Sequence, residues 1–130
     1  MEQEYLIDTN VIIDYMGERF PAPVLDFLDN IFNTYFFLSV VNKIELLGFK
    51  SPTPNEEKQF KNLISASSII LLHDGIVDET IALRKRYSIK LPDAIIAASA
   101  ISIDAILITG DLADFSKVNS LKLLDPNTIK

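Results

Sequence analysis

The sequence lacks cysteine altogether and contains only one histidine and four glycines among its 130 residues. Without cysteine, the chain can form neither disulfides nor thiolate metal sites, and this absence fits a reducing, cytoplasmic compartment. The single histidine, His73, has no nucleophile close to it in the sequence and makes no hydrolase triad. The four glycines are scattered, so they form neither a phosphate-binding P-loop nor a dinucleotide fingerprint.

Long apolar runs and an excess of basic residues are also missing. No apolar stretch approaches the length needed to cross a membrane. The N-terminus does not show the basic region followed by an apolar run that marks a signal peptide. The formal net charge of -6 argues against broad, non-specific nucleic-acid binding. It remains compatible with a nuclease whose acids surround metal ions, and with a basic protein partner.

The length and the hydrophobic content of 48% predict one globular domain spanning residues 1–130. Short apolar runs predict strands at residues 4–8, 35–39, 68–72, 105–109 and 121–124. Helical spacing predicts helices at residues 10–16, 40–48, 75–87 and 94–103, and two more that begin at Pro23 and Pro54, the latter after a break at 51–54. This alternation predicts an α/β fold with a central parallel sheet of about five strands and helices on both faces.

The segment Leu6–Asn10 carries the first candidate functional residue. Its apolar run ends in Asp8, which we expect at the carboxyl end of a buried strand, with Thr9 or Asn10 capping the next helix. Ligands of open α/β sheets bind outside the carboxyl ends of the strands. Asp8 is therefore either a catalytic acid or an ordinary helix cap.

Acidic residues recur at places where an expected strand ends or an expected helix begins. These residues are Asp8, Glu45, Asp93, Asp111 and Asp114. Each has a structural explanation when taken singly, as a cap, a first-turn acid or a surface residue. Glu45 is the least ordinary, because Val41 and Gly48 share its helix face, and an acid on an apolar face needs a partner or a cation.

Taken together, the acids predict a metal site at one edge of the sheet. Two carboxylates about 4 Å apart repel by about 4 kcal/mol at an effective dielectric constant near 20, so a cluster requires protons or cations. Oxygen ligands suit Mg²⁺ or Mn²⁺. A pair of such ions can activate water for phosphodiester hydrolysis.

The same acids lie in four motifs, which are Leu6–Asn10, Glu45 with Leu46 and Gly48, Asp93–Ala100, and Thr109–Phe115. Together these motifs resemble those of the PIN-domain family. The resemblance runs from Tyr5 to about Leu124, and the chain length is similar to that of the VapC-type toxins of toxin–antitoxin systems. It implies a PIN-like fold and an endoribonuclease that uses Mg²⁺ or Mn²⁺, with one or two ions bound.

The resemblance also implies a role for individual residues. The family's catalytic, metal-binding quartet corresponds to Asp8, Glu45, Asp93 and Asp111, its additional metal-binding acid to Asp114, and its supporting polar positions to Thr9, Asn10 and Thr109. The family reaction is in-line attack by metal-activated water, which leaves a 5′-phosphate and a 3′-hydroxyl. VapC-like members usually form homodimers and are held inactive by a small antitoxin.

Two positions depart from the family pattern. Asn42 replaces a small hydroxyl residue, and Gly110 replaces a larger polar or basic residue before the last acid of the quartet. Neither change removes a carboxylate, so we expect them to affect substrate contacts rather than the chemistry.

The densest basic run has two interpretations. Arg84, Lys85 and Arg86, with Lys90 close by, could hold RNA phosphates beside the acids or could form a solvated helix face.

The sequence leaves two rival functions open. One is a PIN-fold module that binds a protein partner without nuclease turnover. The other is a phospho-acceptor signalling domain, which also groups aspartates at strand ends. That domain needs a lysine directly after a late strand, whereas here none follows residues 105–109 until Lys117.

Overall fold

The structure of the protein, a computed structural model, describes residues 3–50 and 53–130. Its strands are β1 (Tyr5–Ile7), β2 (Phe37–Ser39), β3 (Ser68–Ile70), β4 (Ile106–Ile108) and β5 (Lys122–Leu124). Its α-helices are α1 (Thr9–Met16), α2 (Ala22–Thr34), α3 (Val40–Leu47), α4 (Pro54–Ala66), α5 (Asp74–Arg86), α6 (Leu91–Ser102) and α7 (Leu112–Phe115), and a 3₁₀ turn, η1, covers Pro126–Thr128.

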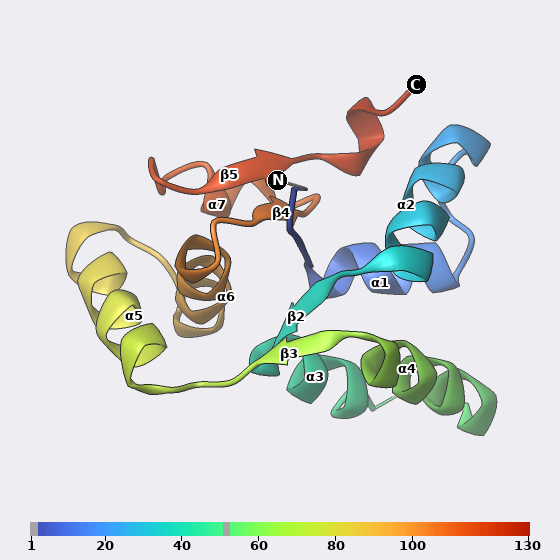
Figure 1. Cartoon of the computed structure of the whole chain (residues 1–130), viewed down its shortest axis with the longest axis horizontal. Coiled ribbons are helices and arrows are strands. Elements are labelled where there is room, and N and C mark those ends of the chain that lie inside the picture. The colour runs from blue at the N-terminus through green and yellow to red at the C-terminus, as the bar shows by residue number, and fades with distance from the viewer. Residues whose placement is uncertain (1–2, 51–52) are drawn as a thin grey trace.

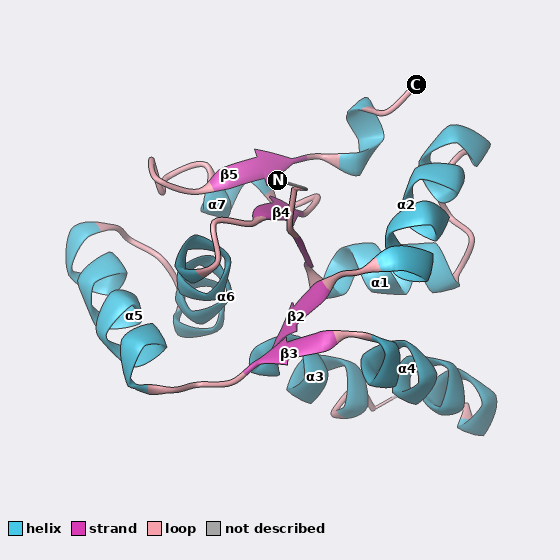
Figure 2. Ribbon diagram, in the orientation of Figure 1, coloured by secondary structure: helices cyan, strands magenta, loops and turns pink. Residues whose placement is uncertain are grey.

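The five strands form one parallel sheet in the order β3-β2-β1-β4-β5 (Figures 1 and 2). The chain first builds the sheet outward from β1 through β2 to β3, and then returns to add β4 and β5 on the other side of β1. In the register of the central pair, Ile7 lies opposite Ile108. The strand order reverses between β1 and β4, and ligands of open α/β sheets bind at such a reversal.

Helices cover both faces of this sheet because neighbouring strand residues point in opposite directions. Leu6 and Leu107 belong to a core shared with α5, α6 and α7. Ile7 and Ile108, one position further along, belong to a second core shared with α1, α2, α3 and α4. Figure 1 shows α5 and α6 on the left of the sheet and α1, α2 and α4 on the right.

Helix α6 is buried almost all round, as its apolar sequence predicts. Its alanines at positions 94, 97, 98 and 100 are all 0% exposed, and these small side chains allow close packing of α6 against α5, β2 and β4. Lys90 is the N-cap of α6 and Pro92 lies in its first turn. Asp93, also in this first turn, lies beside Asp111 and Asp114, which follow β4, so the helix begins at the carboxyl edge of the sheet.

The predicted α/β fold, with five parallel strands and helices on both faces, is confirmed. The strands are shorter than expected: β3 ends at Ile70, and Leu71 and Leu72 are 63% and 50% exposed. Of the expected break at 51–54, residues 51 and 52 lie outside the described part of the chain. Within the described ranges, no helix combines the length and the apolar character that spanning a bilayer requires.

Candidate metal centre

The carboxyl ends of β1 and β4 place two polar segments side by side. Asp8 follows β1 directly, and its backbone N–H donates to the Ile108 carbonyl at 2.9 Å. Thr109 follows β4 in the same way, and Gly110 and Asp111 come next. Parallel pairing in this register makes Asp8 and Thr109 neighbours although they are 101 residues apart in the chain.

Asp8 is buried and both of its carboxylate oxygens are hydrogen-bonded. Oδ1 accepts from the Thr9 backbone N–H at 2.9 Å, and Oδ2 accepts from the Thr109 hydroxyl at 2.7 Å. Asp8 is itself the N-cap of α1, as one of its two interpretations predicted, so the expectation that Thr9 or Asn10 would cap this helix is wrong. The extended backbone of Asp8 (φ -76°, ψ 153°) explains the difference, because a cap residue keeps the strand conformation that precedes the helix.

The environment of Asp8 raises its pKa to about 6. Burial is the main cause, and the charges of Glu45 and Asp93 act in the same direction. The hydrogen bonds from Thr109 and Thr9 oppose the shift because they stabilise the carboxylate form. A cation bound nearby would relieve this cost of ionisation.

Three carboxylates converge close to Asp8. Asp93, Asp111 and Asp114 each have one carboxylate oxygen in this cluster, and these three oxygens lie within 4.8 Å of one another. Asp93 comes from the first turn of α6, Asp111 is the N-cap of α7, and Asp114 lies in that short helix, where its N–H donates to Asp111 Oδ1 at 3.3 Å. All three side chains are partly buried, which leaves them open to an ion.

The pKa of Asp93 is raised, first by burial and then by the charges of Asp111, Asp114 and Glu45. The Lys90 ammonium opposes this shift. Repulsion between carboxylates at this separation costs about 4 kcal/mol per pair at an effective dielectric constant near 20. A divalent cation would remove that repulsion, and the donor set of carboxylate oxygens fits Mg²⁺ or Mn²⁺.

Glu45 reaches the same edge from α3 but is exposed, so the expectation that it lies on an apolar face is wrong. Its neighbour Ile44 is 65% exposed as well. Glu45 Oε1 accepts a 2.7 Å hydrogen bond from the Thr9 hydroxyl, which provides the expected partner. Its charge acts on both Asp8 and Asp93. Glu45 therefore belongs to the acidic edge, although it stands outside the three-carboxylate group.

The supporting polar residues differ in how firmly they are held. Thr109 is buried; its hydroxyl donates to Asp8 and accepts from the Asp111 N–H at 3.0 Å. Thr9 links Asp8 to Glu45 through its backbone and hydroxyl. Asn10 is exposed and makes only a long contact, with its Oδ1 accepting from the Gly110 N–H at 3.5 Å.

Two further residues, Asn42 and Lys117, contact the site residues in ways that were not predicted. Asn42, which we expected to affect substrate contacts, is 0% exposed, so a substrate cannot reach it; its side chain instead donates to Thr9 Oγ1 at 3.0 Å. The Ser39–Asn42 spacing of a capping box could have indicated a structural role.

Lys117 pairs with Asp114 at 3.6 Å and donates to the Ser88 carbonyl at 3.0 Å. The spacing of three residues between Asp114 and Lys117 in a helical turn could have indicated this ion pair.

The basic run divides into two parts. Arg84, Lys85 and Arg86 are exposed in the last turn of α5, where they complement the helix dipole, and Arg86 stacks on Tyr87 at 5.4 Å from the ring centroid. Among the ion pairs of the described residues, none joins these three side chains to a carboxylate. Lys90 lies nearer the acids, because its charge acts on Asp93.

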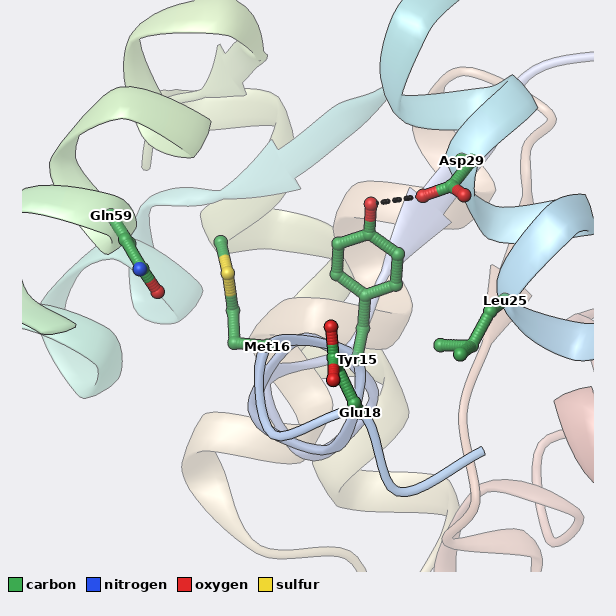
Figure 3. A pocket seen from close by; sticks show the side chains of 6 residues that line it. All are labelled: Tyr15, Met16, Glu18, Leu25, Asp29 and Gln59. Atoms are coloured by element: carbon green, nitrogen blue, oxygen red, sulfur yellow. Dashed lines mark hydrogen bonds between the residues drawn. The ribbon is translucent and has the colours of Figure 1, made fainter. Parts of the chain in front are cut away.

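A separate hollow lies between α1, α2 and α4. One cavity there has a volume of about 330 Å³ and is lined by Tyr15, Met16, Glu18, Leu25, Asp29 and Gln59 (Figure 3). The Tyr15 hydroxyl points at Asp29 and donates a hydrogen bond to it. Burial and this bond raise the pKa of Tyr15 to about 12. None of the clustered carboxylates lines this cavity, so the candidate chemistry lies elsewhere.

A known protein family matches most of the chain. The profile of the PIN domain matches residues 5–121. This chain belongs to the PIN domain family. The family resemblance drawn from the sequence motifs is thereby confirmed, and it is favoured over the phospho-acceptor alternative. No curated protein sequence matches the chain significantly.

Solved structures of toxin–antitoxin complexes share the PIN fold of this chain. A toxin–antitoxin complex from Klebsiella pneumoniae is 27% identical, with a TM-score of 0.76 over 95% of this chain and 98% of that chain. DNA-bound VapBC from Salmonella typhimurium is 20% identical, with a TM-score of 0.79 over 96% and 99% of the two chains. VapBC2 from Rickettsia felis, bound to a promoter DNA fragment, is also 20% identical, with a TM-score of 0.78 over 94% and 98%. These likenesses are consistent with a VapC-type PIN domain.

Proposed function

We propose that this PIN domain is a metal-dependent endoribonuclease and the toxin of a toxin–antitoxin pair. The observation that carries the proposal is the convergence of Asp93, Asp111 and Asp114 within 4.8 Å at the strand-order reversal of the sheet. Asp8 and Glu45 add two more carboxylates to the same edge. Such a concentration of oxygen ligands fits one or two Mg²⁺ or Mn²⁺ ions.

The ion would be held by the clustered carboxylates, with Asp8 and Glu45 as further ligands. A bound Mg²⁺ or Mn²⁺ ion supplies an activated water molecule and stabilises the leaving oxygen of a phosphodiester. Thr9 and Thr109 orient the Asp8 carboxylate with one hydrogen bond to each oxygen. Asn10 is exposed, and its Oδ1 accepts from the N–H of Gly110, the residue before Asp111. In-line attack of water would leave a 5′-phosphate and a 3′-hydroxyl.

We propose that RNA phosphates contact the basic residues next to this edge. Lys90 is the first candidate, because its charge already acts on Asp93. Arg84, Lys85 and Arg86 form an exposed positive stretch on the preceding helix end. Contacts of this kind position a strand without reading its sequence. The rest of the acidic surface would limit RNA binding to this basic region.

A protein partner is the other part of the proposal. The Klebsiella pneumoniae relative, at 27% identity, was solved as a toxin–antitoxin complex. We propose that a small antitoxin binds this chain and blocks its activity, that the chain forms a homodimer, and that it acts in the cytoplasm.

Analytical ultracentrifugation of the purified protein measures the homodimer directly, and a monomer at micromolar concentration would contradict it.

Asp93→Asn tests the metal site. Calorimetric titration of metal-stripped protein with Mn²⁺ should show saturable binding to the wild type and at least tenfold weaker binding to the variant. The variant should also fail to cleave a panel of structured RNAs in Mn²⁺, while its circular dichroism spectrum stays unchanged. Asp26→Asn, at an exposed position on α2, is the matched control and should behave as the wild type.

The outcomes separate the two remaining functions. If the Asp93→Asn protein, purified and stripped of metal, cleaves RNA as fully as the wild type, the nuclease assignment is contradicted. Mn²⁺ binding by the wild type without turnover on any RNA would favour a PIN-fold module that acts through its protein partner.

A further inference from the structure

Asn42 is buried beneath the acidic edge and makes two side-chain hydrogen bonds. Its Oδ1 accepts from the Ser39 backbone N–H at 2.8 Å, and its Nδ2 donates to Thr9 Oγ1 at 3.0 Å. The first bond is half of the capping box that begins α3, in which the Ser39 hydroxyl accepts from the helix backbone. Asn42 thus connects the start of α3 to the start of α1.

The hydrogen bond from the Ser39 N–H determines the orientation of the Asn42 side-chain amide. A backbone N–H can only donate, so the atom facing it must be the carbonyl oxygen of the amide. The amino group then faces Thr9, and it can only donate. Rotating the amide by 180° would place two donors against each other at Ser39 and leave a buried N–H without its acceptor.

The orientation of Asn42 in turn determines the direction of the Thr9 hydroxyl. That hydroxyl has one proton, and the Asn42 amino group occupies an acceptor position on its oxygen. The proton is therefore directed to Glu45 Oε1, which lies 2.7 Å away. A hydrogen bond to a carboxylate is charge-assisted and stronger than one between neutral groups.

Residues 42 and 45 are three apart on α3, so they face the same side of the helix and Thr9 can bridge them. We propose that Asn42 is a positioning residue that acts through Thr9 to hold the Glu45 carboxylate toward the metal site. This inference rests on the proposed function, since Glu45 matters here as a metal ligand. Glu45 is exposed, and among residues 3–50 and 53–130 the Thr9 hydroxyl is the hydrogen-bond partner that orients its flexible side chain.

Four variants test the relay by calorimetric Mn²⁺ titration. Thr9→Val removes the hydroxyl at nearly constant volume, and Asn42→Ala removes the amide. Each should weaken Mn²⁺ affinity roughly tenfold, as loss of an outer-shell partner usually does. Combining them should cost no more than the larger single loss, because both act through one chain of hydrogen bonds. Thr9→Ser retains the hydroxyl and should restore the wild-type affinity.

Ser39→Ala is the matched control. It removes the other half of the same capping box and leaves the Asn42–Thr9–Glu45 chain in place. It should lower the melting temperature but leave Mn²⁺ affinity unchanged. If Asn42→Ala fails to fold, Asn42→Asp serves instead, because it retains the acceptor for the Ser39 N–H and lacks the donor for Thr9. Its added negative charge alone would strengthen cation binding, so weaker binding identifies the lost donor.

A second readout needs no metal. In the ¹⁵N spectrum of the metal-free protein, the side-chain amide of Asn42 should be protected from exchange and should shift in Thr9→Val. Affinity losses that add in the double variant, or an unchanged affinity in both Asn42 variants, would overturn the inference while leaving the nuclease proposal intact. Absence of Mn²⁺ binding to the wild type would overturn the metal site itself, and the role of Asn42 with it.

Discussion

The Thr109 hydroxyl donates a 2.7 Å hydrogen bond to the buried carboxylate of Asp8, which lies 101 residues earlier in the chain. The bond crosses from the end of β4 to the end of β1, where the strand order reverses. The same hydroxyl accepts from the Asp111 N–H at 3.0 Å. One side chain thus ties the most buried acid of the site to the start of α7, which carries Asp111 and Asp114.

Replacing Thr109 with valine should destabilise the protein at neutral pH. The valine side chain would leave an oxygen of Asp8 and the N–H of Asp111 without their partner, which costs about 1–3 kcal/mol for each buried group left unsatisfied. Urea unfolding at pH 7 in EDTA measures the loss. Thr80→Val is a suitable control, because Thr80 is also buried and its hydroxyl only adds a second bond to a helix carbonyl. Equal losses in both variants would contradict a special role for Thr109.

The metal-free protein should lose stability as the pH rises. The pKa of Asp8 is about 6 in the folded state and 3.8 in the reference state, so the folded state binds more protons between these values. The free energy of unfolding should therefore fall through Asp8 by about 3 kcal/mol in all, most of it between pH 4 and pH 7, since one pKa unit corresponds to roughly 1.4 kcal/mol. Asp93, whose pKa is also raised, adds a contribution of the same sign.

Unfolding curves in EDTA at several pH values, for the wild type and Asp8→Asn, measure this dependence. The variant should show a flatter profile and should be the more stable protein at pH 7. With saturating Mn²⁺ the wild-type slope should reverse, because metal binding requires ionised carboxylates. A wild-type stability in EDTA that rises between pH 4 and pH 7 would contradict the proposed environment of Asp8.

Gly48→Ala should destabilise the end of α3. A Cβ at this position would lie 2.7 Å from the Ile44 carbonyl oxygen, which itself accepts the Gly48 N–H. Relief of this overlap should cost about 1–3 kcal/mol, measured as a fall in melting temperature. Gly110→Ala provides the control, since the nearest atom to its Cβ would be Asn10 Oδ1 at 4.0 Å. Equal melting temperatures for Gly48→Ala and Gly110→Ala would contradict this steric explanation.

Lys117→Met should strengthen Mn²⁺ binding at low salt. The Lys117 ammonium lies 3.6 Å from Asp114 and competes with a cation for that carboxylate. Both side chains are partly exposed, so the pair contributes at most about 1 kcal/mol and the gain should not exceed about fivefold. Calorimetry at low and high salt tests the effect, which should decrease as salt screens it. Lys122→Met, which breaks the pair with Asp104, should leave the affinity unchanged.

A weaker affinity in Lys117→Met would show that the bond from Lys117 to the Ser88 carbonyl matters more than its charge. Lys117 would then act by holding α7 against the segment before α6.

Much of this architecture could be predicted because its causes are local. The spacing of apolar residues determines where α5 and α6 form, and both lie within three residues of their expected bounds. Alternation of strands with helices predicts a parallel sheet, which the order β3-β2-β1-β4-β5 confirms. The site residues themselves stay a prediction until metal binding is measured.

The errors arose where a residue's surroundings come from distant parts of the chain. Asp8, and not Thr9 or Asn10, caps α1, because its backbone stays extended and its N–H pairs with the Ile108 carbonyl of β4. Glu45 was placed on an apolar face from its neighbours in sequence, but its side chain is exposed and bonded to the Thr9 hydroxyl of α1. Asn42 looked like a surface contact and is fully buried.

The sequence by itself determined that acids stand at strand ends and helix starts, because capping chemistry and hydrophobic period act over a few residues. Only the tertiary structure decided which of them meet. The packing of α6 against the sheet brings Asp93 to Asp111 and Asp114, and the pairing of β1 with β4 brings Asp8 to Thr109. Such distances depend on contacts between segments far apart in the chain, which no local pattern records.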